Sequence, residues 1–473
     1  MKPSQLQQAA LAAHRFGLGE ADLAVVGADA HGWLLAQIGA ADSQRGSALP
    51  DLNQALTVQI EARRQGGAAG NLALRNLVQS DIRARLQTAS STQRPFAERL
   101  ALFWCNHFTV SLGKGSTTGL VGAFEREAIR PHIAGRFADL LMAATSHPAM
   151  LRYLDNTQSA GPQSRIVQRL QYRGSPPPGA AQARDMAAPP PPRLTGLNEN
   201  LARELLELHT LGVAGGGGAY GPWGGYGQAD VTALAAVLTG WRGPRLGDVA
   251  ARDGPREVFD ANWHQPGAKA VLGRSYAEGP QALRQVVDDL SRHPSTARFI
   301  ATKLVRHLVA DQPPLPLVAR VAERFSQSDG DLTAVYTALL DGAEAWQAQP
   351  AKLKTPEEFV ISSARLMRLG ERLTARAPDA GLAALGQRPH AASSPAGWSD
   401  HAADWLGPEA VWQRMEWSLQ LAERMGGTLD ARALAQASLG PLLGQTSQQQ
   451  IERAANGAQA LTLLMMAPEF QRR

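Results

Sequence analysis

Apolar residues recur along most of this chain at the three- and four-residue spacing of an amphipathic helix. Glycine and proline interrupt the pattern and mark where one helix should end and the next begin. In the first part of the chain the pattern predicts helices within residues 4–39, 51–90, 94–110, 120–129 and 132–144. Farther along it predicts helices at 198–211, 228–240, 294–310, 315–326, 332–341, 356–369, 408–424 and 451–466.

Strand-like character is confined to residues 255–275. There Glu257–Asp260 and Lys269–Gly273 flank a tight turn and are expected to pair as a short β-hairpin. No regular repeat and no sustained heptad pattern is present. The sequence therefore predicts an all-α fold, with one large helical domain over residues 1–473 and at most one short hairpin.

Two biased stretches interrupt the helical pattern. Residues 160–193 contain two proline runs and five arginines against a single acid, Asp185, which is typical of a mobile cationic insertion. Residues 213–227 are rich in glycine and are expected to form a second flexible loop.

Composition narrows the class of protein. Of the 473 residues, 44% are apolar and 19% are charged, as in soluble globular proteins, and the net charge is +5. No basic run or zinc-finger spacing indicates nucleic-acid binding. Cys105 is the only cysteine, so no intramolecular disulfide can form. No signal peptide or membrane span is evident, so the chain as written is expected to be cytoplasmic, with export left open.

Ionisable residues are most concentrated in the predicted helix 198–211. At about 100° per residue, one arc of this helix holds Asn200, Arg203, Glu204 and Glu207 together with Glu199, and the other arc is apolar and includes His209. Two interpretations remain open. The polar arc is a solvated face joined by ion pairs four residues apart, or it lines a cleft in which glutamates act as acid, base or ligand. His209 is expected to be a core histidine.

Further candidate residues lie outside this helix. Asn106 and His107 end an apolar helix and either cap it or point into the same cleft; Asp155 is the best acidic candidate elsewhere. His264, expected to be exposed on a tight loop, and the tryptophans Trp241 and Trp263 are candidates for a substrate-contact wall. Oxygen ligands with one imidazole suit several divalent metals, so Glu204, Glu207, Asp155 and His107 form a candidate metal-binding set. No Walker A, Gly-x-Ser-x-Gly or His-Glu-x-x-His motif is present.

Several separated stretches resemble the uncharacterised bacterial family known as domain of unknown function 1800. The resemblance is carried by Arg15–Gly17, Trp104–Ser111, His147–Asn156, Asn198–Gly212, Tyr226–Val231, Leu238–Trp241, Trp263–Lys269, Lys354–Val360 and Pro395–Trp398. It implies a helical bacterial protein, often exported and often encoded beside a sulfatase-like partner, and it implies no established activity. The chain departs from the family pattern at Gln265, where relatives often carry an aspartate, and this disfavours that loop as an anionic ligand.

Two functional hypotheses follow from the residues. In the first, the protein is a hydrolase or lyase, with a carbohydrate favoured as substrate because aromatic residues accompany paired carboxylates. Glu204 and Glu207 would then supply acid and base, Arg203 would orient one of them, and Asn200, Asn106 and His107 would position the substrate. In the second, the same polar face is a structural network or partner surface of a non-catalytic binding or assembly protein, with residues 160–193 as its docking segment.

Overall fold

Proline and capping side chains determine where several helices of the computed structural model begin. The structure describes residues 2–46, 49–174, 196–213, 225–244, 259–425 and 427–473. Proline is the first residue of α5, α8, α14 and α17, a position where its fixed φ fits the helix and no hydrogen bond is lost. Before α17, Thr355 and Glu358 form a capping box in which each side chain accepts from the other residue's backbone N–H.

Helices make up most of the described structure, which confirms the all-α prediction. In the first half of the chain they are α1 (Pro3–Leu11), α2 (Ala30–Leu35), α3 (Leu52–Gln65), α4 (Gly67–Ser91), α5 (Pro95–His107), α6 (Val121–Phe124), α7 (Phe137–Ser146), α8 (Pro148–Tyr153), α9 (Arg165–Gly174), α10 (Asn200–Glu204) and α11 (Gln228–Leu238). In the second half they are α13 (Gln281–Ser291), α14 (Pro294–Leu308), α15 (Leu315–Gln327), α16 (Leu332–Leu340), α17 (Pro356–Leu366), α18 (Pro408–Met425), α19 (Ala431–Leu439), α20 (Gln445–Glu452), α21 (Gly457–Met466) and α22 (Pro468–Gln471).

A single two-stranded sheet is present in the described residues, and its pairing differs from the expected one. Strand β1 (Lys269–Val271) pairs antiparallel with β2 (Arg274–Tyr276). Leu272 and Gly273 both have positive φ, so the chain reverses in a two-residue turn directly after β1. Of the stretch predicted to pair with β1, Glu257 and Val258 lie outside the described residues, and Phe259 forms an isolated bridge with Trp241.

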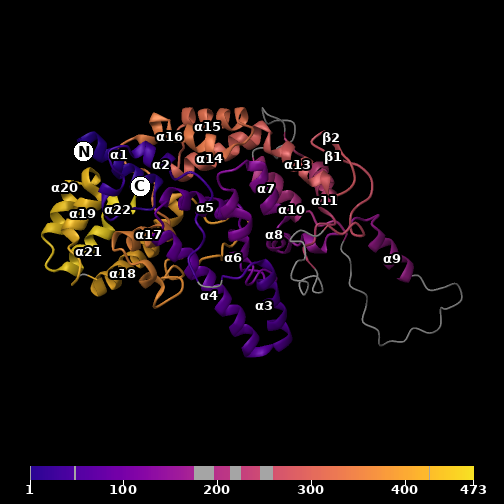
Figure 1. The fold of residues 1–473 in the computed structure, drawn as a ribbon, viewed down its shortest axis with the longest axis horizontal. Coiled ribbons are helices and arrows are strands. Elements are labelled where there is room, and N and C mark those ends of the chain that lie inside the picture. Colours follow the sequence, from indigo (N-terminus) through magenta and orange to yellow (C-terminus); the bar gives the residue numbers. More distant parts are fainter. Residues whose placement is uncertain (1, 47–48, 175–195, 214–224, 245–258, 426) are drawn as a thin grey trace.

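The apolar residues form two buried clusters that share helices α4 and α5. One cluster includes Phe96 and Trp104 of α5 and extends through α7, α11 and α13–α16. The other includes Leu86 of α4 and Leu102 of α5 and extends through α17–α19, α21 and α22. Figure 1 shows the second group at one end of the molecule, where both chain termini also lie. Helices α4 and α5 thus lie where the two clusters meet.

The two predicted insertions fall largely outside the described residues. Of residues 160–193, the described part ends at residue 174 and contains α9; of residues 213–227, only 213 and 225–227 are described. None of the helices in the described ranges is long and apolar enough to cross a membrane.

Candidate functional site

The segment Gln387–Asp400 separates two hollows in the protein. An inner cavity of about 80 Å³ is lined on this side by Gln387, His390 and Asp400 among others. An outer groove of about 510 Å³ is lined by Ala391, Ser393 and other residues of the same segment. Ala392 lines both, so the cavity and the groove are immediate neighbours.

The inner cavity lies where the two apolar clusters meet. Leu18 and Leu102 of one cluster and Val121 and Phe124 of the other contribute to its wall. The rest of the wall includes ionisable side chains from helices α4, α5, α14 and α17, from the π-helix after α6 and from the 387–400 segment. They are Arg85, Arg99, Glu125, His307, Glu357, Glu358, His390 and Asp400. Buried charges need partners, and the arrangement of these partners defines the cavity.

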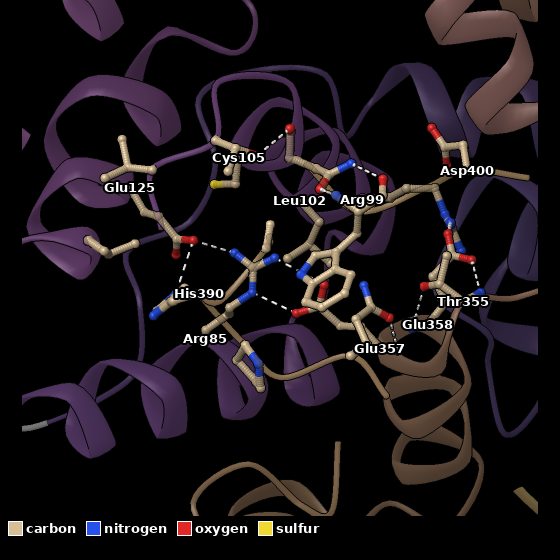
Figure 2. A pocket seen from close by; sticks show the side chains of 18 of the residues that line it. Arg85, Arg99, Leu102, Cys105, Glu125, Thr355, Glu357, Glu358, His390 and Asp400 are labelled. Carbon is tan, nitrogen blue, oxygen red and sulfur yellow. Dashed lines mark hydrogen bonds and ion pairs between the residues drawn. The ribbon is translucent and has the colours of Figure 1, made fainter. Parts of the chain in front are cut away.

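Arg85 connects two carboxylates across the cavity wall (Figure 2). Its Nε and Nη2 donate to the two carboxylate oxygens of Glu357, at 2.6 and 3.0 Å. Its Nη1 donates to Glu125, and Nε2 of His390 lies 3.2 Å from the same Glu125 oxygen. Burial opposes ionisation of Glu125, but Arg85 and His390 lower the pKa of this carboxyl well below its usual range. Glu125 is therefore ionised.

A second group surrounds Glu358. Its carboxylate accepts from Arg99, and from Nη2 of Arg473 at 2.7 Å. Nε2 of His307 lies 4.0 Å from the same oxygen, and Nδ1 of His307 is 2.9 Å from a carboxylate oxygen of Asp400. Burial opposes the ionisation of Glu358, but the charges of Arg473 and Arg99 more than offset it and lower the pKa of Glu358.

Cys105 lines the inner cavity as a neutral thiol. Burial, followed by the charge of Glu125, raises its pKa well above the ordinary thiol value. Because the thiolate is the nucleophile, the side chain is unreactive at neutral pH.

The outer groove contains Glu204, which is half-buried. Burial and the charge of Glu207 raise the pKa of Glu204, while Arg203 acts in the opposite direction. In the described part of the chain Glu204 makes no hydrogen bond or ion pair. Tyr153 and Asn200 line the groove beside it, with Lys114 and Ser111 from the loop after α5. A carboxyl of raised pKa in a hollow of this size can exchange a proton with a bound molecule.

The helix expected at 198–211 is α-helical only over Asn200–Glu204. A π-helix, η6 (Leu205–Thr210), continues it, and the Leu211 N–H donates to the Leu206 carbonyl five residues before. The hydroxyl of Thr210 also bonds to the Leu205 carbonyl, at 2.6 Å. A π-turn inserts extra backbone and occurs often at functional sites. Glu207 lies within this π-helix, and its charge still acts on Glu204, so the shared polar arc stays a prediction.

Part of that arc is structural. Nη2 of Arg203 donates to Glu199 at 3.2 Å, and Glu199 also accepts from Gln228 and Thr232 of α11. Arg203 therefore joins α10 to α11 and makes no bond to Glu204 or Glu207. Glu207 is partly buried and lies close enough to Tyr226 for its charge, after burial, to raise the pKa of that tyrosine.

Asn106 and His107 point in different directions. Asn106 lines the inner cavity, and its side chain exchanges two hydrogen bonds with the backbone of Trp398, at 2.7 and 2.9 Å. His107 is buried among aromatic rings with Nε2 3.2 Å from the carbonyl of His209. Burial lowers the pKa of His107 well below its usual value and that of His209 to about 3. Both histidines are neutral core residues, as expected for His209.

The remaining candidates lie outside the inner cavity. Asp155 is ion-paired with Lys114 of the groove at 2.5 Å. Trp241 is buried, and Trp263 stacks under the guanidinium of Arg242 at 3.2 Å from the ring centre. The expectation that His264 is exposed is wrong: it is buried, with its Nδ1 2.7 Å from the Thr239 carbonyl. The loop folds inward because this histidine bonds to the end of α11.

The candidate metal set is not assembled. His107 lies in the aromatic core, and Asp155 is occupied by Lys114. Within the described ranges no group of three or more histidine, cysteine or acidic side chains is placed to hold one ion.

Sequence reasoning missed most of the inner cavity. Glu357 and Glu358 fall at the start of the helix predicted at 356–369, and Arg99 falls within the helix predicted at 94–110. A charged residue inside such an apolar helix was the available signal, because buried charges require partners. His390 and Asp400 carry no comparable local pattern.

The structure thus defines an all-helical protein with a buried, ion-paired cavity beside a groove that contains an unpaired carboxyl. The chain belongs to the family described as protein of unknown function (DUF1800), whose model matches residues 11–472. Neither the curated proteins nor the solved structures contain a significant match.

Proposed function

We propose that the protein is a glycoside hydrolase with Glu204 as its general acid in the outer groove. The observation that carries this proposal is the state of the Glu204 carboxyl, which is half-buried, unpaired among the described residues and raised in pKa. A general acid needs a carboxyl that still holds its proton near the working pH. Glu207, whose charge contributes to that raised pKa, is the proposed base.

The groove's lining favours a neutral sugar. Tyr153 offers an aromatic face, and Asn200, Ser111 and Ser393 offer hydrogen-bonding groups. Among the described lining residues Lys114 is the only cation, and Asp155 neutralises it. A lyase acting on a uronate would need a free cation beside the substrate carboxylate. For this reason we favour hydrolysis over elimination.

The test is a panel of neutral and uronate polysaccharides incubated with the purified full chain. We expect new reducing ends from a neutral polysaccharide, without an unsaturated product. Glu204→Gln should abolish release. Glu199→Gln, a matched change at the N-cap of the same helix, should preserve it because the Glu199 side chain bonds, among the described residues, only to Arg203 and α11 side chains. Release of an unsaturated uronate, or equal activity of both variants, contradicts the proposal.

A second candidate is a non-catalytic binding or assembly protein. The observation in its favour is that Glu199 and Arg203, two of the five residues of the predicted polar arc, form a structural link between α10 and α11. Saturable binding of a polysaccharide that stays intact, unchanged in Glu204→Gln, is the result that this candidate predicts.

A further inference from the structure

The inner cavity contains buried hydrogen-bonding atoms that the described residues leave without a partner. They include Nη2 of Arg99 and Nε2 of His307. An unpaired buried polar group costs about 1–3 kcal/mol, so nearly all such groups in native proteins bond to protein or to a bound molecule. Both residues line the same cavity of about 80 Å³, which is large enough for a few waters or one very small molecule.

His307 is held so that one nitrogen stays free. Burial opposes ionisation of Asp400, but His307 and Lys352 lower its pKa to about 2, so this carboxylate is ionised. Nδ1 of His307, 2.9 Å away, must therefore carry the hydrogen and donate it. Burial lowers the pKa of His307 itself, so the ring is neutral and Nε2 presents a bare lone pair. An acid that orients a histidine in this way leaves Nε2 as a hydrogen-bond acceptor.

Arg99 supplies the complementary donor. Its side chain is 1% exposed; Nε donates to the Gly17 carbonyl at 2.7 Å, and Nη1 donates to Glu358. Nε2 of His307 is 4.0 Å from that same Glu358 oxygen. The charged guanidinium of Arg99 and the neutral acceptor of His307 therefore both lie near one carboxylate oxygen at the cavity wall.

The charge of the cavity limits what can fill it. Its described lining contains four carboxylates (Glu125, Glu357, Glu358 and Asp400) against two arginines (Arg85 and Arg99), and each carboxylate already has a partner. The arginines, together with Arg473 on Glu358, are already paired with these carboxylates. An added anion would be buried without a counter-charge of its own in a region of low dielectric, which is costly. A hydroxyl group, which donates one hydrogen bond and accepts others, matches both free atoms without adding charge.

We infer that the inner cavity is a binding site for a small neutral molecule carrying a hydroxyl group, which donates to Nε2 of His307 and accepts from Nη2 of Arg99. This site goes beyond the proposed hydrolase, because Glu204 does not line the cavity and no part of the argument depends on the groove's chemistry. Ala392 separates the two hollows, so a molecule bound here lies directly behind the groove.

The experiment uses the full chain labelled with ¹⁵N in its histidine rings and ethylene glycol as the probe. We expect the Nε2 resonance of His307, assigned with His307→Gln, to shift saturably as ethylene glycol is added. His264 is the internal control, because its Nδ1 and Nε2 already lie 2.7 and 2.9 Å from the Thr239 carbonyl and the Lys269 amine. Its resonances should not move. Sodium acetate, a charged probe of similar size, should bind more weakly.

Variants test the two partners. Arg99→Gln should weaken binding of ethylene glycol about tenfold, as expected for the loss of one charged hydrogen bond. If this variant does not fold, His307→Leu tests the other partner, with saturation transfer from protein to ethylene glycol as the readout and the same loss expected. A His307 shift that is unsaturable and matched by His264 overturns the inference, because the cavity then holds only water. Tighter binding of acetate than of ethylene glycol also overturns it.

Discussion

Glu199 and Glu204 lie five residues apart, and their surroundings give them different chemistry. Glu199 accepts three hydrogen bonds, from Arg203, Gln228 and Thr232, and these bonds lower its pKa. Glu204 accepts none from the described residues, and burial raises its pKa. Hydrogen bonds favour the ionised form of a carboxyl, whereas desolvation favours the protonated form. The difference in environment, more than the density of charge in the sequence, is the basis for proposing Glu204 as the acid.

This difference predicts a stability effect at Glu204. Between the ordinary pKa of a glutamate and the raised pKa in the fold, the native protein keeps a proton that the unfolded chain has lost. Stability therefore falls as the pH rises through that window. Glu204→Gln removes this penalty and should stabilise the protein at pH 7, the trade-off common at functional sites. Denaturant unfolding measures the change; a loss of stability at pH 7 would indicate a structural role.

A second residue-scale prediction concerns His209. Burial lowers its pKa to about 3, and neither ring nitrogen has a hydrogen-bond partner in the described residues. The unfolded chain takes up a proton below about pH 6.5. Stability should therefore be highest above this pH and fall as the pH decreases, by up to about 1.4 kcal/mol per unit for each such histidine.

His209→Leu removes this contribution. The free energy of unfolding of the variant minus that of wild type should be about 1–2 kcal/mol larger at pH 5 than at pH 7. Chemical unfolding at the two pH values provides the test. A difference between variant and wild type that does not change with pH would mean that His209 is protonated in the fold.

At the scale of elements, the start of α17 positions the inner cavity. Thr355 accepts from the Glu358 N–H at 3.3 Å, and the Glu358 carboxylate accepts from the Thr355 N–H at 3.0 Å. The same carboxylate binds Arg99 of α5 and the Arg473 side chain. A local capping motif thus fixes an acid that joins helices far apart in the sequence.

Removal of this cap should destabilise both the start of α17 and the position of the Glu358 carboxylate. Thr355→Ala is expected to cost about 1 kcal/mol of unfolding free energy, and Thr355→Ser, which keeps the hydroxyl, much less. Thermal unfolding of the two variants side by side checks this. Equal losses in both would show that the methyl group of Thr355 matters more than its hydrogen bond.

Local sequence signals predict where helices α5 and α17 begin. They do not predict features that depend on a change of helix type or on a distant partner. The start of α17 follows from Thr-Pro-Glu-Glu, and α5 from Pro95 and an apolar run. The π-turn after α10 was not predicted, because periodicity arguments assume 3.6 residues per turn throughout. The prediction that His264 is exposed was wrong because its partner, the Thr239 carbonyl, lies at the end of a helix distant in sequence from the loop.

At the scale of the whole molecule, Arg85 links the two apolar clusters. It extends from α4 to Glu357 at the start of α17 and to Glu125 after α6, pairings that span 272 and 40 residues of sequence. No local sequence pattern identifies partners so far apart in the chain, so the inner cavity was not predictable. The fold class was predictable because it depends on local helical periodicity. Burial of the charges makes each member depend on the others.

Loss of Arg85 should therefore be costly. Arg85→Gln leaves Glu125 and Glu357 without their main cationic partner and is expected to cost about 3–5 kcal/mol. Adding Glu357→Gln should recover part of that loss, because the double variant buries one fewer unpaired charge. Denaturant unfolding of both single variants and the double variant measures the coupling. Strict additivity would show that the two side chains do not interact.

A comparison of initial rates decides whether Glu204 is the acid of a hydrolytic groove. The substrate is the neutral polysaccharide from which wild type releases reducing ends fastest. Loss of a general acid typically reduces the rate by a factor of about 10²–10⁴. We expect the initial rate of Glu204→Gln to fall by this factor and that of Glu199→Gln to stay close to wild type. Equal rates for the two variants would contradict it.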